Sequence, residues 1–236
     1  MRVGDTVRRP TGPWTPAVHA LLQHLERKGF TGAPRVHGLD DQGREILEYI
    51  DGEVQWPDNG RLDDKSLLQR VGAALRALHD AVADFTPPPG AVWRFAEMQA
   101  DSEPYADARG IIVCHNDPAA WNVVASAERV AFIDWDVAGP RPPIWDVSYC
   151  AVSLLAPQAP VERRLRALAD GYDLSAADRT RLPEVIVARI RSSREHMRRR
   201  AEAGIAPWDR LWAGGHGKAW TELLELALHL SGTLTL

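Results

Sequence analysis

The chain has 236 residues, of which 45% are hydrophobic and 25% charged, and this is enough apolar material for a substantial core. Its formal net charge of −4 argues against a general attraction to nucleic acid or to an anionic membrane, and is more compatible with a small cationic partner. No apolar run approaches the roughly 20 residues of a membrane helix, and Met1–Pro10 is charged where a signal peptide would be hydrophobic, so we expect a cytoplasmic protein.

The first 50 residues predict a small unit with the order β, β, α, β, β. Thr15 followed by Pro16 predicts the start of the helix, with the threonine as its cap, and Gly29 predicts its end. Alternating patterns bounded by turn residues predict the strands Arg2–Val3, Thr6–Arg9, Arg35–Leu39 and Glu45–Ile50.

After Asp51-Gly52 the pattern becomes mainly helical. The segment from about Asp63 to Val82 is strongly amphipathic, and Pro87–Gly90 interrupts regular structure. Helix is expected for most of the chain from Ile144 onward. Between these parts, three apolar runs predict short strands that frame a loop: Ile111–Cys114, Val123–Ala125 and Val130–Ile133. The chain should therefore divide into a part covering residues 1–50 and a helical part covering residues 51–236.

The loop between the first two of these short strands carries the most informative motif. It reads His115-Asn116-Asp117 and ends at Asn122, which gives the pattern HxDxxxxN, and Asp134 follows the third strand. Phosphoryl transfer needs a carboxylate beside the attacking hydroxyl and hard oxygen ligands for Mg²⁺. Such residues can also be ordinary loop caps and turn formers, but their joint spacing favours the functional interpretation.

This pattern resembles the aminoglycoside phosphotransferases and related small-molecule kinases, which have a protein-kinase-like fold. The similarity includes the strand that ends in Ile133-Asp134, the later Trp145-Asp146 and the segment Leu47–Gly52, and it is weakest over the last 80 or so residues. The resemblance implies a two-lobed α+β fold with a small β-rich N-terminal lobe and a larger helical C-terminal lobe. It also implies transfer of the γ-phosphoryl of ATP or GTP to a hydroxyl of a small molecule.

The resemblance assigns roles to residues at matching positions. Asp117 would orient the substrate hydroxyl and accept its proton, while Asn122 and Asp134 would bind Mg²⁺. The hinge backbone of Glu48, Tyr49 and Ile50 would pair with adenine. Three further roles are implied: His115 would brace the loop, Asp136 would be a further metal ligand or order the loop, and Asp146 would accept hydrogen bonds from loop amides or simply cap its helix.

The sequence departs from the family pattern in three places. Only Gly4 precedes the Thr6–Arg9 strand, so a Gly-rich hairpin over the phosphates is not expected. Arg9 stands where a kinase has a lysine, and strand alternation would point it toward the phosphates. The acidic partner of this cation is undecided, because the first helix offers His19, Gln23 and Glu26. Asn116 replaces the commoner glycine and should matter little.

Two alternatives follow from these departures. One is a kinase-like protein that binds nucleotide or another ligand with little or no catalysis. The other is a protein kinase, which is disfavoured because no long activation segment follows Asp134. The acceptor is not identified by the sequence, since antibiotics, amino alcohols, sugars and nucleoside-like metabolites all fit this fold.

Several other residues have simpler expected roles. Cys114 and Cys150 should be reduced core thiols. Trp208 and Trp212 could line a substrate cleft, whereas Trp145 should pack in the core. A run of arginines predicts a solvated helix face: Arg189, Arg191, Arg194, Arg198, Arg199 and Arg200.

Overall fold

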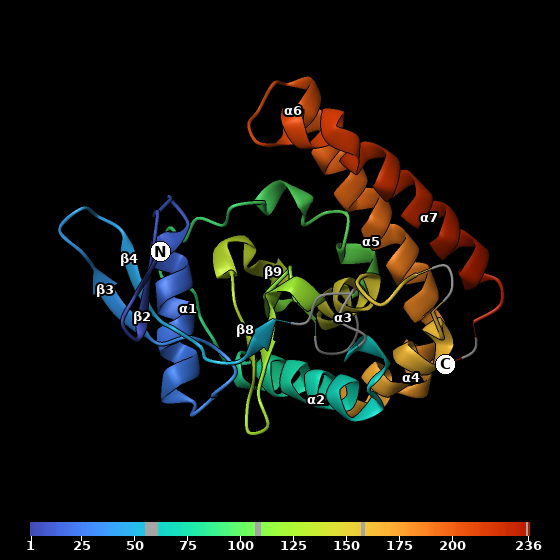
Figure 1. Ribbon diagram of the computed structural model, residues 1–236, viewed down its shortest axis with the longest axis horizontal. Coiled ribbons are helices and arrows are strands. Elements are labelled where there is room, and N and C mark those ends of the chain that lie inside the picture. The colour runs from blue at the N-terminus through green and yellow to red at the C-terminus, as the bar shows by residue number, and fades with distance from the viewer. Residues whose placement is uncertain (55–60, 107–109, 157–158, 235) are drawn as a thin grey trace.

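The computed structural model of the chain describes residues 1–54, 61–106, 110–156, 159–234 and 236. Its N-terminal part is rich in strands and its C-terminal part is mainly helical, which confirms the predicted α+β fold (Figure 1). The strands β1–β4 lie at one end of the molecule, and the long helices of the C-terminal part lie at the other. Within the described ranges, no helix is long and apolar enough to cross a membrane.

The N-terminal sheet is antiparallel and has the strand order β1-β2-β4-β3. Its turn after β3 is stabilised by Asp40, whose carboxylate accepts hydrogen bonds from the backbone amides of Gln42 and Arg44. Each predicted strand is present, and the ends differ by two residues at most. The strands are β1 (Arg2–Val3), β2 (Thr6–Arg9), β3 (Val36–Leu39) and β4 (Glu45–Glu48).

Helix α1 (Thr15–Arg27) packs one apolar face inward, and Val18, Leu21, Leu22 and Leu25 are all buried. The predicted threonine cap is wrong. Trp14 occupies the cap position without a side-chain hydrogen bond, and Thr15 is already helical. The Thr15 hydroxyl instead accepts a hydrogen bond from the Gly12 amide at 2.9 Å, and so closes the turn that leads into the helix.

Two small sheets follow the hinge. Strand β5 (Glu53–Val54) pairs with β7 (Val123–Ala125), which pairs with β8 (Val130–Phe132), while β6 (Ile112–Cys114) pairs with β9 (Gly139–Arg141). Patterning did not predict β5 and β9, because β5 has two residues and β9 contains Pro140. The chain enters β5 through Gly52, where a side chain could not fit: an added Cβ would lie 2.8 Å from a methyl of Val124.

The helical part is built around a close crossing of α2 (Lys65–Ala81) and α4 (Val161–Tyr172). The Asp64 carboxylate caps α2 by accepting hydrogen bonds from the amides of Ser66 and Leu67. Gly72 and Gly171 bring the backbones together: a Cβ on Gly72 would lie 2.3 Å from the carbonyl oxygen of Leu168. The buried stripe of α2 is as predicted, with Leu67, Leu68, Val71, Leu75 and Leu78.

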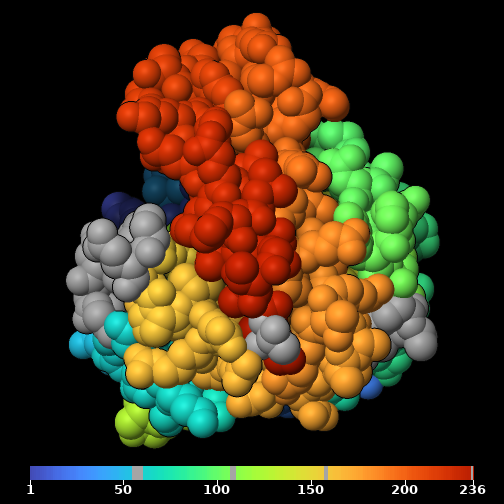
Figure 2. Space-filling model, turned by 90° about the vertical axis from the view of Figure 1, so that its right-hand side faces the viewer, coloured from blue at the N-terminus to red at the C-terminus, as the bar shows by residue number. Residues whose placement is uncertain are grey.

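Four further α-helices complete the helical part. They are α3 (Pro143–Val152), α5 (Ala176–Glu202), α6 (Trp208–Leu211) and α7 (Gly217–Ser231). Helix α7 packs along α5 and, seen from the side in Figure 2, covers its outer face. Cys114 and Cys150 are buried and unpaired, as expected.

Candidate functional site

The loop after β6 is held in place by Asp146, in the first turn of α3. This side chain is fully buried, and its carboxylate oxygens accept hydrogen bonds from the amides of His115 at 2.9 Å and Asn116 at 2.7 Å. The ring of His79 lies 3.1 Å from the same carboxylate. Burial acts against the charge, but the hydrogen bond and charge of His79 hold the pKa of Asp146 below its usual value. The expected contact with loop amides is confirmed.

The ring of His115 connects the loop to the neighbouring strand segment through two hydrogen bonds. Its Nδ1 accepts a hydrogen bond from the amide of Asp117 at 3.2 Å, which leaves Nε2 to donate to the carbonyl of Ile133 at 3.0 Å. Complete burial lowers the pKa of His115, so the ring is neutral in this tautomer. The ring thus joins the loop to the residue that precedes Asp134.

Asn116 has a larger structural role than its place in the motif suggested. Its backbone is left-handed, with φ of 67°, a conformation that glycine adopts freely and that asparagine tolerates better than most residues. The side-chain amide donates to the carbonyls of Val137 at 3.0 Å and Gly139 at 3.2 Å. Asn116 therefore links the loop to the segment that follows Asp134. The one signal for this role in the sequence is that asparagine, which tolerates a left-handed backbone, stands where glycine is commoner.

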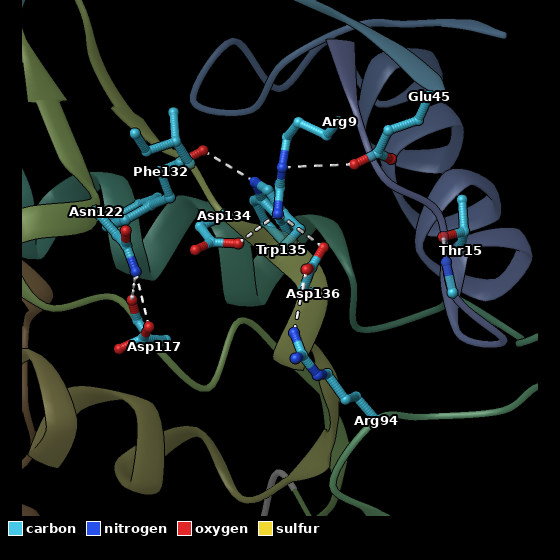
Figure 3. Close-up of polar contacts among 12 residues, drawn as sticks. Arg9, Thr15, Glu45, Arg94, Asp117, Asn122, Phe132, Asp134, Trp135 and Asp136 are labelled. Atoms are coloured by element: carbon cyan, nitrogen blue, oxygen red, sulfur yellow. Dashed lines mark hydrogen bonds and ion pairs between the residues drawn. The ribbon is translucent and has the colours of Figure 1, made fainter. Parts of the chain in front are cut away.

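Asp117 and Asn122 are in direct contact. The Nδ2 of Asn122 donates to the Asp117 carboxylate at 2.8 Å and to its backbone carbonyl at 3.0 Å (Figure 3). Because this amide nitrogen is engaged, the Oδ1 of Asn122 is available as an oxygen ligand. The Oδ1 of Asp117 is buried and has no hydrogen-bond partner in the described part of the chain.

The environment of Asp117 favours a protonatable carboxyl. Burial, with a smaller contribution from the charge of Asp134, raises its pKa to about 7, and Arg189 opposes the shift. A carboxyl that titrates near neutral pH suits general-base chemistry.

Asp134 lies close to this loop, because the amide of the preceding residue, Ile133, donates to the carbonyl of Asn122 at 2.9 Å. Its backbone is left-handed, with φ of 64°, and its side chain is 50% exposed. Such a conformation is costly for aspartate and is typical of functional positions. The three predicted residues thus lie together: Asp117 and Asn122 in contact, and Asp134 one residue beyond Ile133. The side-chain oxygens of Asn122 and Asp134 are hard donors of the type that Mg²⁺ prefers.

Arg9 reaches this group from the N-terminal sheet. Its Nη2 lies 2.7 Å from Asp134 and 3.0 Å from Asp136, and Asp136 also contacts Arg94 at 3.2 Å (Figure 3). Its acidic partner within the sheet is on a strand and not on α1. Arg9 and Glu45 are cross-strand neighbours of β2 and β4, and the Arg9 Nε lies 3.7 Å from the carboxylate.

His19, one of the three helix candidates, lies 3.0 Å from the other oxygen of Glu45. It therefore contacts the partner of Arg9 and not Arg9 itself. The signal for Glu45 was hidden from the sequence, since the pairing depends on β4 lying between β2 and β3.

The hinge is partly engaged within the protein. The amide of Glu48 donates to the carbonyl of Arg35 at 2.8 Å, and the amide of Tyr49 donates to the carbonyl of Asp5 at 2.9 Å. The guanidinium of Arg2 stacks on the Tyr49 ring at 3.7 Å. The backbone of Ile50 makes no backbone hydrogen bond to any residue that the structure describes. The side chain of Ile50 packs in a small apolar cluster with Val124 and Ala131, separate from the main core.

A cavity of about 540 Å³ opens beside Asp117 on the side of the helical part. Asn116 and Asp117 line this cavity, and α5 and α6 supply much of the rest of its lining, including the predicted Trp208. Trp212 does not line it. That ring instead lies under the guanidinium of Arg194. A cavity of this size and position suits a small molecule that presents a group to Asp117.

The prediction that the arginine run is a solvated face is wrong for Arg189. This side chain is only 6% exposed, lines the cavity, and donates from Nη2 to the carbonyl of Asn116 at 2.7 Å. Its guanidinium stacks on Tyr149 at 4.2 Å. A 3.6-residue repeat of arginines does not reveal which one turns inward.

Comparison with known proteins agrees with this geometry. A model of the phosphotransferase enzyme family matches residues 7–109 and 89–185. A trifolitoxin immunity protein of Rhizobium leguminosarum bv. trifolii is 36% identical over 196 residues, which cover 75% of this chain and 71% of the relative.

Solved structures with the same fold include small-molecule kinases. A choline/ethanolamine kinase family protein from Mesorhizobium loti has a TM-score of 0.66 and 18% identity, over 98% of this chain and 87% of that one. An amicoumacin kinase in complex with AMP-PNP and Ca²⁺ has a TM-score of 0.65 and 13% identity, over 93% and 80%. The GDP complex of an aminoglycoside 2′-phosphotransferase has a TM-score of 0.56 and 14% identity, over 95% and 86%.

The fold is that of the small-molecule kinases among these solved structures. The chain belongs to the phosphotransferase enzyme family.

Proposed function

We propose that this protein transfers the γ-phosphoryl of ATP or GTP to a hydroxyl of a small molecule held in the cavity beside Asp117. The observation that carries the proposal is the position of Asp117, which lines that cavity and whose Oδ2 accepts a hydrogen bond from Asn122. In this proposal the base, an amide ligand and the acceptor site lie side by side.

The reaction assigns a role to each residue. The acceptor oxygen bonds to the γ-phosphorus while the bond from that phosphorus to the β–γ bridging oxygen breaks, and the nucleoside diphosphate leaves with those electrons. Asp117 orients the hydroxyl and takes its proton. Asn122 and Asp134 would hold Mg²⁺, which when bound neutralises charge on the phosphate oxygens. Arg9, already beside Asp134, lies where it can contact the phosphates.

The nucleotide base would lie at the hinge. Glu48 and Tyr49 donate their amides within the protein, so the hinge amide left for the base is that of Ile50. The partly buried Val54 and Ile133, which pack against the cluster of Ile50, Val124 and Ala131, supply an apolar surface of the kind on which a base packs. This assignment reduces the backbone amides that could donate to the base, which the family pattern places on three residues, to one.

The proposal is tested by release of nucleoside diphosphate in the presence of Mg²⁺ and a panel of hydroxyl compounds, with ATP and GTP assayed in parallel. Wild-type protein should turn over at least one compound, and Asp117→Asn should lose this activity while it keeps its fold by circular dichroism. Equal turnover by the variant would exclude Asp117 as the base.

A second candidate function is ligand binding without catalysis. It is favoured by the hinge amides of Glu48 and Tyr49, which are occupied, and by the ion pair between Arg9 and Asp134. The relative is named for immunity to trifolitoxin, and immunity is compatible with either modification or sequestration of a toxin. Absence of thermal stabilisation at millimolar ATP and Mg²⁺ would favour this second candidate, since a phosphotransferase should be stabilised by its nucleotide.

A further inference from the structure

We infer that the acceptor is an aromatic or otherwise apolar hydroxyl compound that carries a carboxylate or similar anionic group, and that it is not a cation. The inference deepens the proposed function and rests on it, because it concerns the cavity beside Asp117. It replaces the cationic partner expected from the net charge of the whole chain.

The wall of the cavity selects an apolar body. Its large side chains are mostly aromatic and come from several separate segments: Phe95, Trp121, Tyr149, Met197, Trp208 and Trp220. Rings of this size bury flat apolar groups and fix their orientation at small entropic cost. A heavily hydrated polyamine or sugar would lose its water here without finding enough polar partners.

The charges that line the cavity are mainly positive. Arg141 and Arg189 both contribute to the wall, and both are more than nine-tenths buried. Across the described residues, neither guanidinium lies within 4.0 Å of a carboxylate, and the Nε of Arg189 has no hydrogen-bond partner. The charge of Arg189 acts on Asp117, but neither guanidinium has a carboxylate in contact, and a buried cation in this situation favours an anionic ligand. Asp117 is the single carboxylate among the residues that line this cavity, and in the proposed function it binds the hydroxyl of the acceptor and not a cationic group.

Aromatic walls can also bind cations through their ring faces, but here arginines already occupy two of these faces. The guanidinium of Arg189 lies 4.2 Å from the centre of the Tyr149 ring. Arg200 lies 4.9 Å from the centre of the Phe95 ring, and Arg94 lies 5.4 Å from it. An ammonium group would meet like charge at these rings, where a carboxylate would meet attraction.

The test uses three probes that share one phenylethanol body: 4-(2-hydroxyethyl)benzoate, uncharged 2-phenylethanol and 4-(2-hydroxyethyl)benzylamine. Their dissociation constants are measured by ligand-observed NMR with wild-type protein and no nucleotide. The carboxylate should bind about tenfold more tightly than the uncharged probe, and the ammonium more weakly than both. Ammonium binding as tight as that of the carboxylate, or no saturable binding by any probe, would overturn the inference.

In Arg189→Gln the two dissociation constants should become about equal, so that the roughly tenfold preference for the carboxylate over the uncharged probe is lost. Arg191→Gln is the matched control, since that arginine is on the same helix but is exposed and lies outside the cavity wall. If Arg189→Gln does not fold, the order of the three probes on the wild type still decides. A retained preference in folded Arg189→Gln would contradict the role of this residue.

Turnover is measured separately, by ADP release with the same probes. Carboxylate preference in binding without any turnover would support the ligand class inferred for the cavity, and would leave the phosphotransferase proposal to be decided by the panel of hydroxyl compounds. Turnover with the ammonium probe preferred would support the phosphotransferase proposal and overturn the inferred ligand class.

Discussion

The guanidinium of Arg9 lies 2.7 Å from the carboxylate of Asp134, although 125 residues separate them in the chain. Arg9 belongs to the N-terminal sheet and Asp134 follows a strand of the helical part, so this ion pair joins the two parts of the molecule across the site (Figure 3). The cation proposed for the phosphates and the proposed metal ligand neutralise each other until a nucleotide with Mg²⁺ supplies new partners for both.

Replacing Arg9 should therefore weaken nucleotide use. Arg9→Met removes a charge-assisted contact, and the KM for ATP should rise by roughly tenfold to a hundredfold. Arg8→Met is the matched control, because the neighbouring arginine pairs with Asp40 and Thr6 on the other face of the same strand. The KM values are obtained from initial rates of ADP release, and an equal rise in both variants would refute a specific role for Arg9.

The raised pKa of Asp117 predicts how stability depends on pH. Between about pH 4 and pH 7 the folded protein binds a proton at Asp117 that the unfolded chain has released, so stability falls as pH rises through this window. Asp117→Asn lacks this loss, and at pH 8 without metal it should be more stable than wild type by up to a few kcal/mol. Urea unfolding at several pH values in EDTA measures the difference. A variant that is less stable than wild type at pH 8 would argue against the raised pKa.

The site was predictable where local sequence determines it. The HxDxxxxN spacing and the strand that ends at Asp134 place three oxygen-bearing side chains within one loop and its neighbour. The stripe of α2 likewise follows from helical periodicity. Such features need only a few consecutive residues, and the structure has them as expected.

Other parts of the site depend on tertiary register. Glu45 meets Arg9 because β4 lies between β2 and β3, and no pattern along the chain specifies that order. The burial of Arg189 is decided by how α5 packs on α3, since the arginines beside it have the same spacing and remain accessible. Thr15 is a residue type that often caps a helix, but the helix begins at Thr15 itself and Trp14 occupies the cap position.

Asn116 should be the most sensitive residue of the loop after the functional ones. Asn116→Ala loses two hydrogen bonds and must keep a left-handed backbone, whereas Asn116→Gly loses the same bonds without that strain. The alanine variant should be less stable than the glycine variant by roughly 1 kcal/mol. Chemical denaturation of both variants checks this order, and the reverse order would show that the backbone strain is not significant.

The crossing of α2 and α4 should not tolerate a side chain. In Gly171→Ala the new Cβ would lie 2.1 Å from the carbonyl oxygen of Gln69, so the helices must move apart, at a cost of about 2–4 kcal/mol. Gly214→Ala is the control, since nothing lies within 4 Å of its Cβ position, and it should be neutral or slightly stabilising. Melting temperatures of the two variants provide the comparison, and equal values would mean that the crossing relaxes freely.

The loop that carries Asp117 is fixed by Asp146 and His79, whereas the far wall of the cavity, including Trp208, comes from the end of the C-terminal helical pair. These two sets of contacts share few residues. Mutations at the tip of the pair can therefore alter which compound is accepted while the reacting groups keep their alignment. Such a separation would let related proteins diversify in what they recognise through changes at one end of the molecule, and leave the chemistry at its centre intact.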